Sequence, residues 1–156
     1  MREGEYFMKR VRRSILTLSV SLLLLTGIAA YGQIYRYYSP GTIWTVTTIR
    51  IKSGMDQAYL EYLDGSFKRE TDALVQAGYM KSYKILKAID DDTTSWNLII
   101  LREYASLADQ EKNEEKADAK SREVAGNDQQ QMKGYEDRSR IREVLSTKTV
   151  RELRLK

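Results

Sequence analysis

Two segments of this chain are apolar on both of their alternating faces, and this restricts the folds open to it. Residues 43–52 and 95–104 are rich in β-branched and large apolar side chains, so each is predicted to form a β-strand. Successive side chains of a strand point to opposite faces of the sheet, and here both faces carry apolar residues. Both strands are therefore expected in the centre of a sheet that is covered on both sides.

The spacing of apolar residues predicts the elements around these two strands. Residues 54–77 show the helical period, and Gly78 suits a left-handed cap at the end of a helix. Residues 79–88 and 147–155 predict two further strands, whose Lys and Arg side chains are typical of sheet edges because charge discourages unwanted pairing. The central strands are thus expected to have one edge strand on each side.

Two strongly charged stretches are predicted to lie in solvent. Residues 105–144 favour helix, but about residues 110–140 carry few large apolar anchors, which indicates a solvated helical excursion. After Gly126, an apolar stripe of Met132, Tyr135, Ile141 and Leu145 predicts a second helix that docks on the domain. A partner-binding arm is the alternative for this region. Asp90, Asp91 and Asp92 lie between two predicted strands, and since the alternating acidic pattern of a calcium loop is missing, we expect a plain turn there.

The N-terminus has the pattern of a secretory signal peptide. Basic residues 8–13 precede an uncharged apolar run, residues 15–30, that is shorter than a comfortable membrane span. Small residues at Ala30 and Gly32 suit cleavage after Gly32, with Ala30 as the alternative last residue. We therefore expect a signal peptide over residues 1–32, and an exported mature protein, periplasmic or secreted, with no membrane attachment; an uncleaved anchor is the alternative.

The remaining chain is predicted to be one domain with a short lead-in. Tyrosines with Pro40 and Gly41 favour a linker over residues 33–42. Residues 43–156 are long enough for one hydrophobic core and too short for two. The domain organisation expected from the sequence is therefore signal peptide, linker and a single domain that contains the charged excursion.

Composition excludes several classes of function. The chain has 26 Lys and Arg against 22 Asp and Glu, but most of this excess lies in the first 32 residues, so a nucleic-acid partner is not expected. Cysteine and histidine are both absent. This excludes disulfides, thiolate nucleophiles, Ser-His-Asp catalysis, and haem or zinc held by imidazole. We expect no metal and no cofactor.

The order of the predicted elements is that of a ferredoxin-like α+β domain. It is β-α-β-β-α-β with an antiparallel four-stranded sheet, in which the first and third strands lie in the middle. Two helices cover only one face of such a sheet. Each large apolar side chain that stays exposed on the other face lacks the burial free energy of about 1.5–3 kcal/mol that it would contribute in a core. A second copy is therefore expected over that face, in an isologous homodimer. The residues predicted on it are Trp44, Val46, Trp96, Leu98 and Ile100.

The segment of residues 43–155 resembles the dimeric α/β-barrel superfamily. The resemblance rests on the element order, the strand with Trp44, the helix start at Gly54 and Met55, and the terminal strand. It implies two ferredoxin-like subunits with their sheets stacked face to face. The superfamily includes cofactor-free monooxygenases of the antibiotic-biosynthesis type, haem enzymes with an axial histidine, and stress-response proteins. This chain has no histidine, and its charged insertion departs from the compact family plan.

The candidate site is expected between sheet and helices or between the stacked sheets, where apolar walls hold a few polar groups. Aromatic planes would hold a flat apolar ligand, an arginine would pair with its carboxylate or phenolate, and a tyrosine would donate a hydrogen bond. The candidate ligand-binding residues are Trp44, Arg50, Tyr83, Trp96, Arg102 and Tyr104. The interpretation favoured for these six side chains themselves is that the Trp residues form the dimer core and the Arg and Tyr heads reach water at the strand ends.

Three functions remain open at this point. The favoured one is an exported homodimer that binds a small hydrophobic or aromatic molecule without transforming it. The first alternative is a cofactor-free monooxygenase or oxidase of the barrel family. The second is an interaction module whose charged helical region meets another envelope protein. No catalytic residue is assigned in any of these interpretations.

Overall fold

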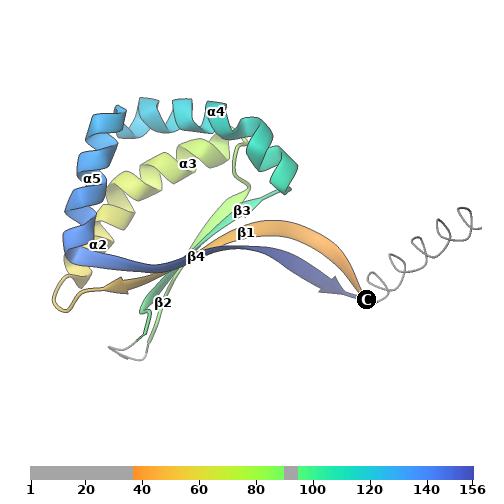
Figure 1. Ribbon diagram of the computed structural model, residues 1–156, viewed down its shortest axis with the longest axis horizontal. Helices are drawn as coiled ribbons and strands as arrows, with labels where there is room; N and C mark the ends of the chain where they lie inside the picture. Colours follow the sequence, from red (N-terminus) through yellow and green to blue (C-terminus); the bar gives the residue numbers. More distant parts are fainter. Residues whose placement is uncertain (1–36, 90–94) are drawn as a thin grey trace, which may run out of the picture. The chain divides into compact units, whose positions relative to one another are not determined.

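The computed structural model describes residues 37–89 and 95–156 (Figure 1). The predicted signal peptide, the first residues of the predicted linker and the aspartate turn lie outside this range. The elements are β1 (Tyr38–Ile51), α2 (Asp56–Tyr62), the π-helical turn η1 (Leu63–Phe67), α3 (Lys68–Gln76), β2 (Ser82–Lys87), β3 (Leu98–Tyr104), α4 (Leu107–Ala125), α5 (Asp128–Ile141) and β4 (Arg142–Leu155).

The described chain divides into two compact units. The larger is Gly41–Glu152, which holds the core and the site described below. In the smaller, residues 37–40 belong with Leu153–Lys156, and the amide of Lys156 donates to the carbonyl of Tyr37 at 3.2 Å. No helix of the described residues is long and apolar enough to cross a membrane.

The sheet has the strand order β2-β3-β1-β4. Both β1 and β2 pair with β3 in antiparallel fashion, in registers that join Ile49 to Leu98 and Ile85 to Ile100. The prediction that the first and third strands are central and the other two lie at the edges is confirmed. The resemblance to ferredoxin-like domains is also confirmed at the level of topology. The helices of the described residues all lie on one side of the sheet (Figure 1).

The core lies between the sheet and the helix α2-η1-α3. The sheet contributes Ile49, Leu98 and Ile100, and the helix contributes Tyr59 and Phe67, all at most 4% exposed. Burying a large apolar side chain contributes about 1.5–3 kcal/mol, so this cluster is the main stabilising feature of the domain.

The face assignment of β3 differs from the prediction. Leu98 and Ile100 were expected on the open face, but they pack against the helices, and Leu98 is 0% exposed. The reason is the register, which places Leu98 opposite Ile49 and so on the core side. Since both alternations of this strand are apolar, the sequence pattern alone did not distinguish them. The open face instead carries Trp44, Val46, Leu86, Ile99 and Leu101.

Several element boundaries also differ. Strand β1 begins at Tyr38 rather than at Ile43, so part of the predicted linker is strand. Proline is tolerated there because the pairing of β1 with β3 begins only at Ile43, so the missing N–H removes no bond between these two strands. Strand β4 begins directly after α5, at Arg142 rather than at Thr147.

Candidate functional site

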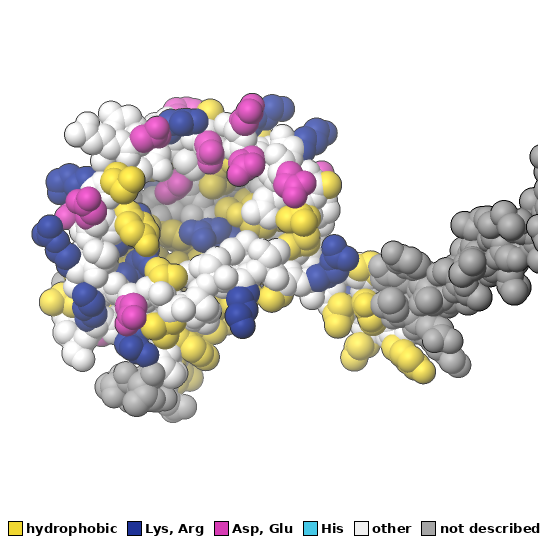
Figure 2. All heavy atoms as spheres, in the orientation of Figure 1, with side chains coloured by type: hydrophobic (Ala, Val, Ile, Leu, Met, Phe, Trp, Pro, Cys, Tyr) yellow, Lys and Arg dark blue, Asp and Glu magenta, His cyan; other side chains and the backbone are white. Residues whose placement is uncertain are grey.

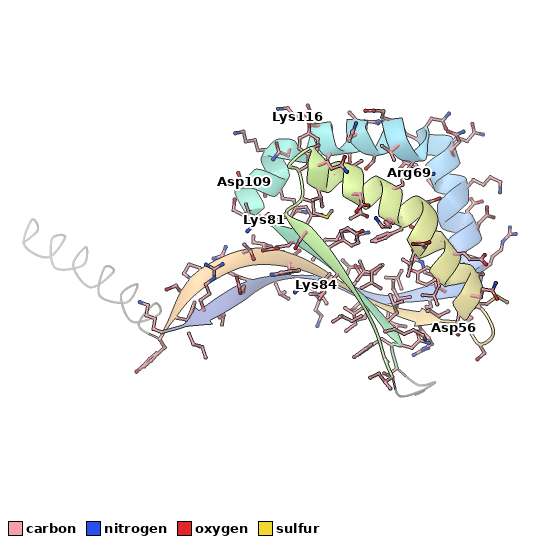
Figure 3. All side chains as sticks on the ribbon, turned by 180° about the vertical axis from the view of Figure 1, so that it is seen from behind. Asp56, Arg69, Lys81, Lys84, Asp109 and Lys116 are labelled. Carbon is pink, nitrogen blue, oxygen red and sulfur yellow. The ribbon has the colours of Figure 1, made fainter. Side chains whose placement is uncertain are left out.

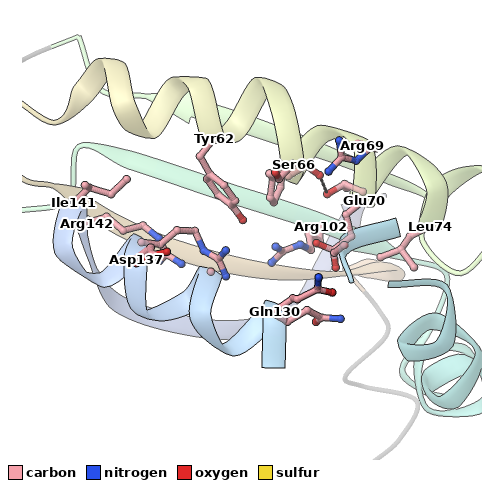
Figure 4. Close-up of a pocket in the computed structure, with 16 residues that line it drawn as sticks. Tyr62, Ser66, Arg69, Glu70, Leu74, Arg102, Gln130, Asp137, Ile141 and Arg142 are labelled. Atoms are coloured by element: carbon pink, nitrogen blue, oxygen red, sulfur yellow. Dashed lines mark hydrogen bonds between the residues drawn. The ribbon is translucent and has the colours of Figure 1, made fainter. Parts of the chain in front are cut away.

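A cavity of about 670 Å³ lies between the helices and the sheet, within the usual range for small-molecule sites. Its walls include Tyr62 and Phe67 of the first helix, Arg102 of β3, Arg138 of α5 and Arg142 of β4. Figure 2 shows this region as a hollow framed by helices, with basic and hydrophobic side chains inside it. Figure 4 shows Arg102 and Arg142 reaching into the cavity, with Tyr62 entering from the helix above.

The cavity exists because α4 and α5 do not pack closely against the sheet. Neither helix contains a buried residue. The prediction of a second docked helix is therefore wrong for most of α5, where Met132 and Tyr135 are 63% and 56% exposed. Lys116 of α4, for example, points away from the sheet (Figure 3). The two helices meet at Gly126, whose φ of 99° needs glycine, and at Asn127, which forms a capping box with Gln130. This corner holds α5 away from the sheet and makes it a wall of the cavity.

Three arginines at the cavity each lie over an aromatic ring. The distances from guanidinium carbon to ring centroid are 5.3 Å for Arg102 over Phe67, 4.7 Å for Arg138 over Tyr62 and 5.5 Å for Arg142 over Tyr59. Within the described residues, no carboxylate forms an ion pair with any of these three arginines. The Nε atoms of Arg138 and Arg142 are buried without a hydrogen-bond partner there. The contacts with the ring faces therefore stabilise these guanidiniums without neutralising their charge.

The three positive charges act on the same two phenol groups. Burial raises the pKa of Tyr59 to about 12, and Arg142, Arg138 and Arg102 each oppose this rise. Burial likewise raises the pKa of Tyr62, again against the charges of the same three arginines. The arginines thus surround one region of the cavity and create a positive potential in it.

Acidic side chains of the lining offset this potential only in part, and the charge of Glu70 raises the pKa of Tyr62 against the effect of the arginines. Asp137 bonds Lys133 at 2.8 Å, a contact that lowers the pKa of Asp137, and it approaches Arg140 at 4.0 Å. Glu70 is half-buried in the wall, beside Arg69 in the chain, and makes no ion pair with the three arginines. The cavity therefore has an excess of positive charge.

The π-helical turn η1 shapes the opposite wall. The amide of Lys68 bonds the carbonyl of Leu63, five residues back, so this turn is wider than an α-helical one. Leu63 and Phe67 stay buried against the sheet while Ser66 lines the cavity. The sequence was predicted to form one regular helix here, and nothing in its apolar period signals the wider turn.

The structure places three of the predicted site residues on the helix face of the sheet. Arg102 lines the cavity, and Tyr83 is its direct neighbour on β2. The Tyr83 hydroxyl donates to Asp72 at 2.8 Å, and its ring meets the edge of Phe67 at 5.8 Å. Tyr104 lies two residues beyond Arg102 on the same face, and burial raises its pKa.

The other three predicted residues lie elsewhere. Trp44 and Arg50 lie on the open face, where Lys84 lies over the Trp44 ring at 5.6 Å and Arg50 pairs with Glu143 at 3.4 Å. Trp96 precedes β3 and is 40% exposed. The six residues therefore do not form one site.

Sequence reasoning missed Arg138 and Arg142. Both lie at the junction of α5 and β4, where the charged pattern predicted a solvated surface. One sequence pattern could have placed these two arginines on the same side of the chain: they are four residues apart, with the apolar Ile141 between them. The nearby Arg140 makes that pattern hard to tell from an ordinary charged surface. Within the part of the chain that the structure describes, no group of three acidic side chains is placed to hold a metal ion.

No protein-family model matches this chain, and no curated protein matches it. It is similar to a crystal structure of a dimeric ferredoxin-like protein from an uncultured marine organism, with a TM-score of 0.47, 13% identity, and coverage of 74% of this chain and 88% of that one. It is also similar to a NIPSNAP family protein with unknown function from Agrobacterium tumefaciens, with a TM-score of 0.45, 15% identity, and coverage of 74% and 90%. Both TM-scores are below 0.5.

Proposed function

We propose that this protein binds a small organic anion in the cavity between helices and sheet. The observation that carries this proposal is the set of three arginines with no carboxylate partner among the described residues. A guanidinium binds a carboxylate through two parallel hydrogen bonds, so an anionic ligand would supply the acceptors that the chain does not. The rings of Tyr62 and Phe67, which line the cavity, would contact the apolar body of the ligand.

A bound anion would also stabilise the folded protein. The Nε atoms of Arg138 and Arg142 are buried, so the anion would accept from the remaining N–H groups of these guanidiniums. Since the ligand would bind only the folded protein, it is expected to raise the melting temperature.

Binding without transformation is favoured over acid–base chemistry. A catalytic base needs a pKa near the working pH. The phenols nearest the three arginines, Tyr59 and Tyr62, both have raised pKa values and stay protonated at neutral pH. Of the two, Tyr62 lines the cavity, so it suits hydrogen-bond donation to a ligand rather than proton abstraction.

Replacing Arg138 with glutamine tests this function. We expect benzoate to stabilise the wild-type protein, and Arg138→Gln to weaken benzoate binding about tenfold or more, because hydrogen bonds to charged groups contribute about 1.5–3 kcal/mol. Titration calorimetry would measure the dissociation constants. The matched control is Arg140→Gln, on the same helix but with a side chain that is 78% exposed. Equal losses in both variants, or no binding by the wild type to benzoate or any other organic anion, would contradict the proposal.

We also propose that a second copy covers the open face of the sheet. This face carries Trp44, Val46, Leu86, Ile99 and Leu101, and none of the described helices lies over it. Leu86 is 49% exposed. A contiguous apolar face of this kind marks an interaction site, and an isologous dimer would bury the same patch on both copies.

The dimer is tested by placing a charge at the centre of the open face. We expect the wild type to be a dimer at micromolar concentration and Leu101→Glu to be a monomer, since burying an unpaired carboxylate is costly. Light scattering measures the mass of each. Met132→Glu, on an exposed position of α5, is the control and should remain dimeric. A wild type that is monomeric under these conditions would refute the dimer.

A further inference from the structure

Glu70 is an acidic side chain of the cavity wall that makes no bond within the described chain. It belongs to α3, lines the cavity and is half-buried there. Figure 4 shows it pointing from this helix into the cavity. None of residues 37–89 and 95–156 forms a hydrogen bond or an ion pair with its carboxylate. Since a carboxylate is an acceptor of strong, charge-assisted hydrogen bonds, Glu70 is open to a cationic group from outside the chain.

Two neighbouring carboxylates show the contrast. Asp137 also lines the cavity, but it bonds Lys133 at 2.8 Å. Asp72 lies two residues beyond Glu70 on the same helix and accepts from the Tyr83 hydroxyl at 2.8 Å. Both of these charges are used by the fold. The charge of Glu70 is not.

Glu70 and an arginine of the cavity act on the same phenol group. Burial raises the pKa of Tyr62, the charge of Arg138 opposes this rise, and the charge of Glu70 adds to it. A positive group from α5 and a negative group from α3 therefore face the same part of the cavity. The two side chains form no ion pair with each other. This part of the cavity thus offers both charges to a ligand.

A purely anionic ligand would suit only one of these two groups. Its carboxylate would bind Arg138, but it would also meet the like charge of Glu70, which weakens binding. A ligand that carries an ammonium group as well would pair with both side chains. The position of Glu70 therefore favours a ligand with two opposite charges over a simple carboxylic acid.

We propose that the ligand is an amino acid in the broad sense, with a carboxylate bound by Arg138 and a protonated amine bound by Glu70. This inference rests on the proposed function, because it assumes that the same cavity binds an organic anion. The apolar part of the ligand contacts the rings of Tyr62 and Phe67, which line the cavity. Glu70 is then the residue that selects amino acids over acids without an amine.

Two matched pairs of acids test this inference. Phenylalanine differs from hydrocinnamate by an amine beside the carboxylate, and para-(aminomethyl)benzoate differs from para-toluate by an amine at the far end. Titration calorimetry on the full wild-type chain at neutral pH would compare the members of each pair. We expect at least one amine-bearing acid to bind about tenfold or more tightly than its counterpart, because the amine adds a charge-assisted bond to Glu70. The pair that shows the preference tells where the amine lies.

Glu70→Gln keeps the shape of the side chain and removes its charge. In this variant the preference for the amine should disappear, and hydrocinnamate should bind at least as tightly as it does to the wild type, since a repelling charge is gone. The matched control is Glu61→Gln, which removes an exposed glutamate of α2 that accepts from Gln57 at 2.9 Å. The control should keep the preference. A Glu70→Gln variant that keeps it too would overturn the role of Glu70.

The outcomes separate this inference from the function on which it rests. If both amine-free acids bind as tightly as their counterparts and Arg138→Gln still weakens them, the amino acid is refuted and the anion site is retained. If phenethylamine, which has the amine without the carboxylate, binds more tightly than phenylalanine and hydrocinnamate, the cavity is a cation site and both proposals fail. If no acid binds, the proposed function itself fails.

Discussion

Leu98→Ala is expected to lower the free energy of unfolding by about 2–5 kcal/mol, the usual cost of a large-to-small change in a core. Leu98 is 0% exposed, lies opposite Ile49 on the central strands and packs with the helix residues of the core. Its removal leaves a cavity that the strands on either side prevent from closing. Denaturation with urea, followed by tryptophan fluorescence, measures the change.

Two further variants make this result specific. Met132→Ala removes an apolar side chain that is 63% exposed and should change the unfolding free energy by no more than about 0.5 kcal/mol. Ile99→Ala lies one residue along the same strand, on the open face, and should cost less than Leu98→Ala in the subunit itself. If Ile99→Ala were the more damaging of the two to the isolated subunit, the face assignment of β3 would be wrong.

The protein is also expected to lose stability at alkaline pH because of Tyr59. Burial raises the pKa of Tyr59 from 10.0 to about 12. The folded state therefore favours the protonated phenol, and the resulting stability is complete below pH 10 and is lost as the pH rises towards 12. A shift of this size corresponds to about 3 kcal/mol at full effect. Burial raises the pKa of Tyr62 and Tyr104 too, which adds in the same direction.

Comparison with Tyr59→Phe isolates this contribution. Phenylalanine keeps the ring beneath Arg142 and removes the ionisable hydroxyl, so the variant should lose less stability between pH 10 and pH 12 than the wild type. Urea denaturation at each pH, with phenolate absorbance recorded alongside, measures both quantities. Parallel loss of stability in the two proteins would show that Tyr59 is not the group responsible.

The sequence predicted the topology because β-branched and large apolar residues mark the strands and the first helix carries a clear apolar period. The central positions of β1 and β3 followed from the apolar residues on both of their faces, and this was correct. Because both faces of β3 are apolar, the sequence did not show which face meets the helices: Leu98 and Ile99 are equally apolar. Only the pairing register, a long-range property, decides between them.

The candidate site was less accessible to sequence reasoning. Arg102 was singled out as a polar residue in an apolar strand, and the structure places it in the cavity. Arg138 and Arg142 were not, because a charged helix without apolar anchors gives no sign that part of it faces inward. The cavity depends on the corner at Gly126 and on the π-helical turn, and neither has a signature in the spacing of apolar residues.

The helices α4 and α5 contribute no buried side chain, although they frame the cavity. The part of the wall that these two helices provide therefore contains none of the buried core residues, and only Ile141, at the end of α5, packs against the core. Mutations along these helices could alter ligand preference without the loss of stability that usually limits such changes. A scaffold of this kind is open to the evolution, or the laboratory redesign, of new specificities while its sheet stays the same.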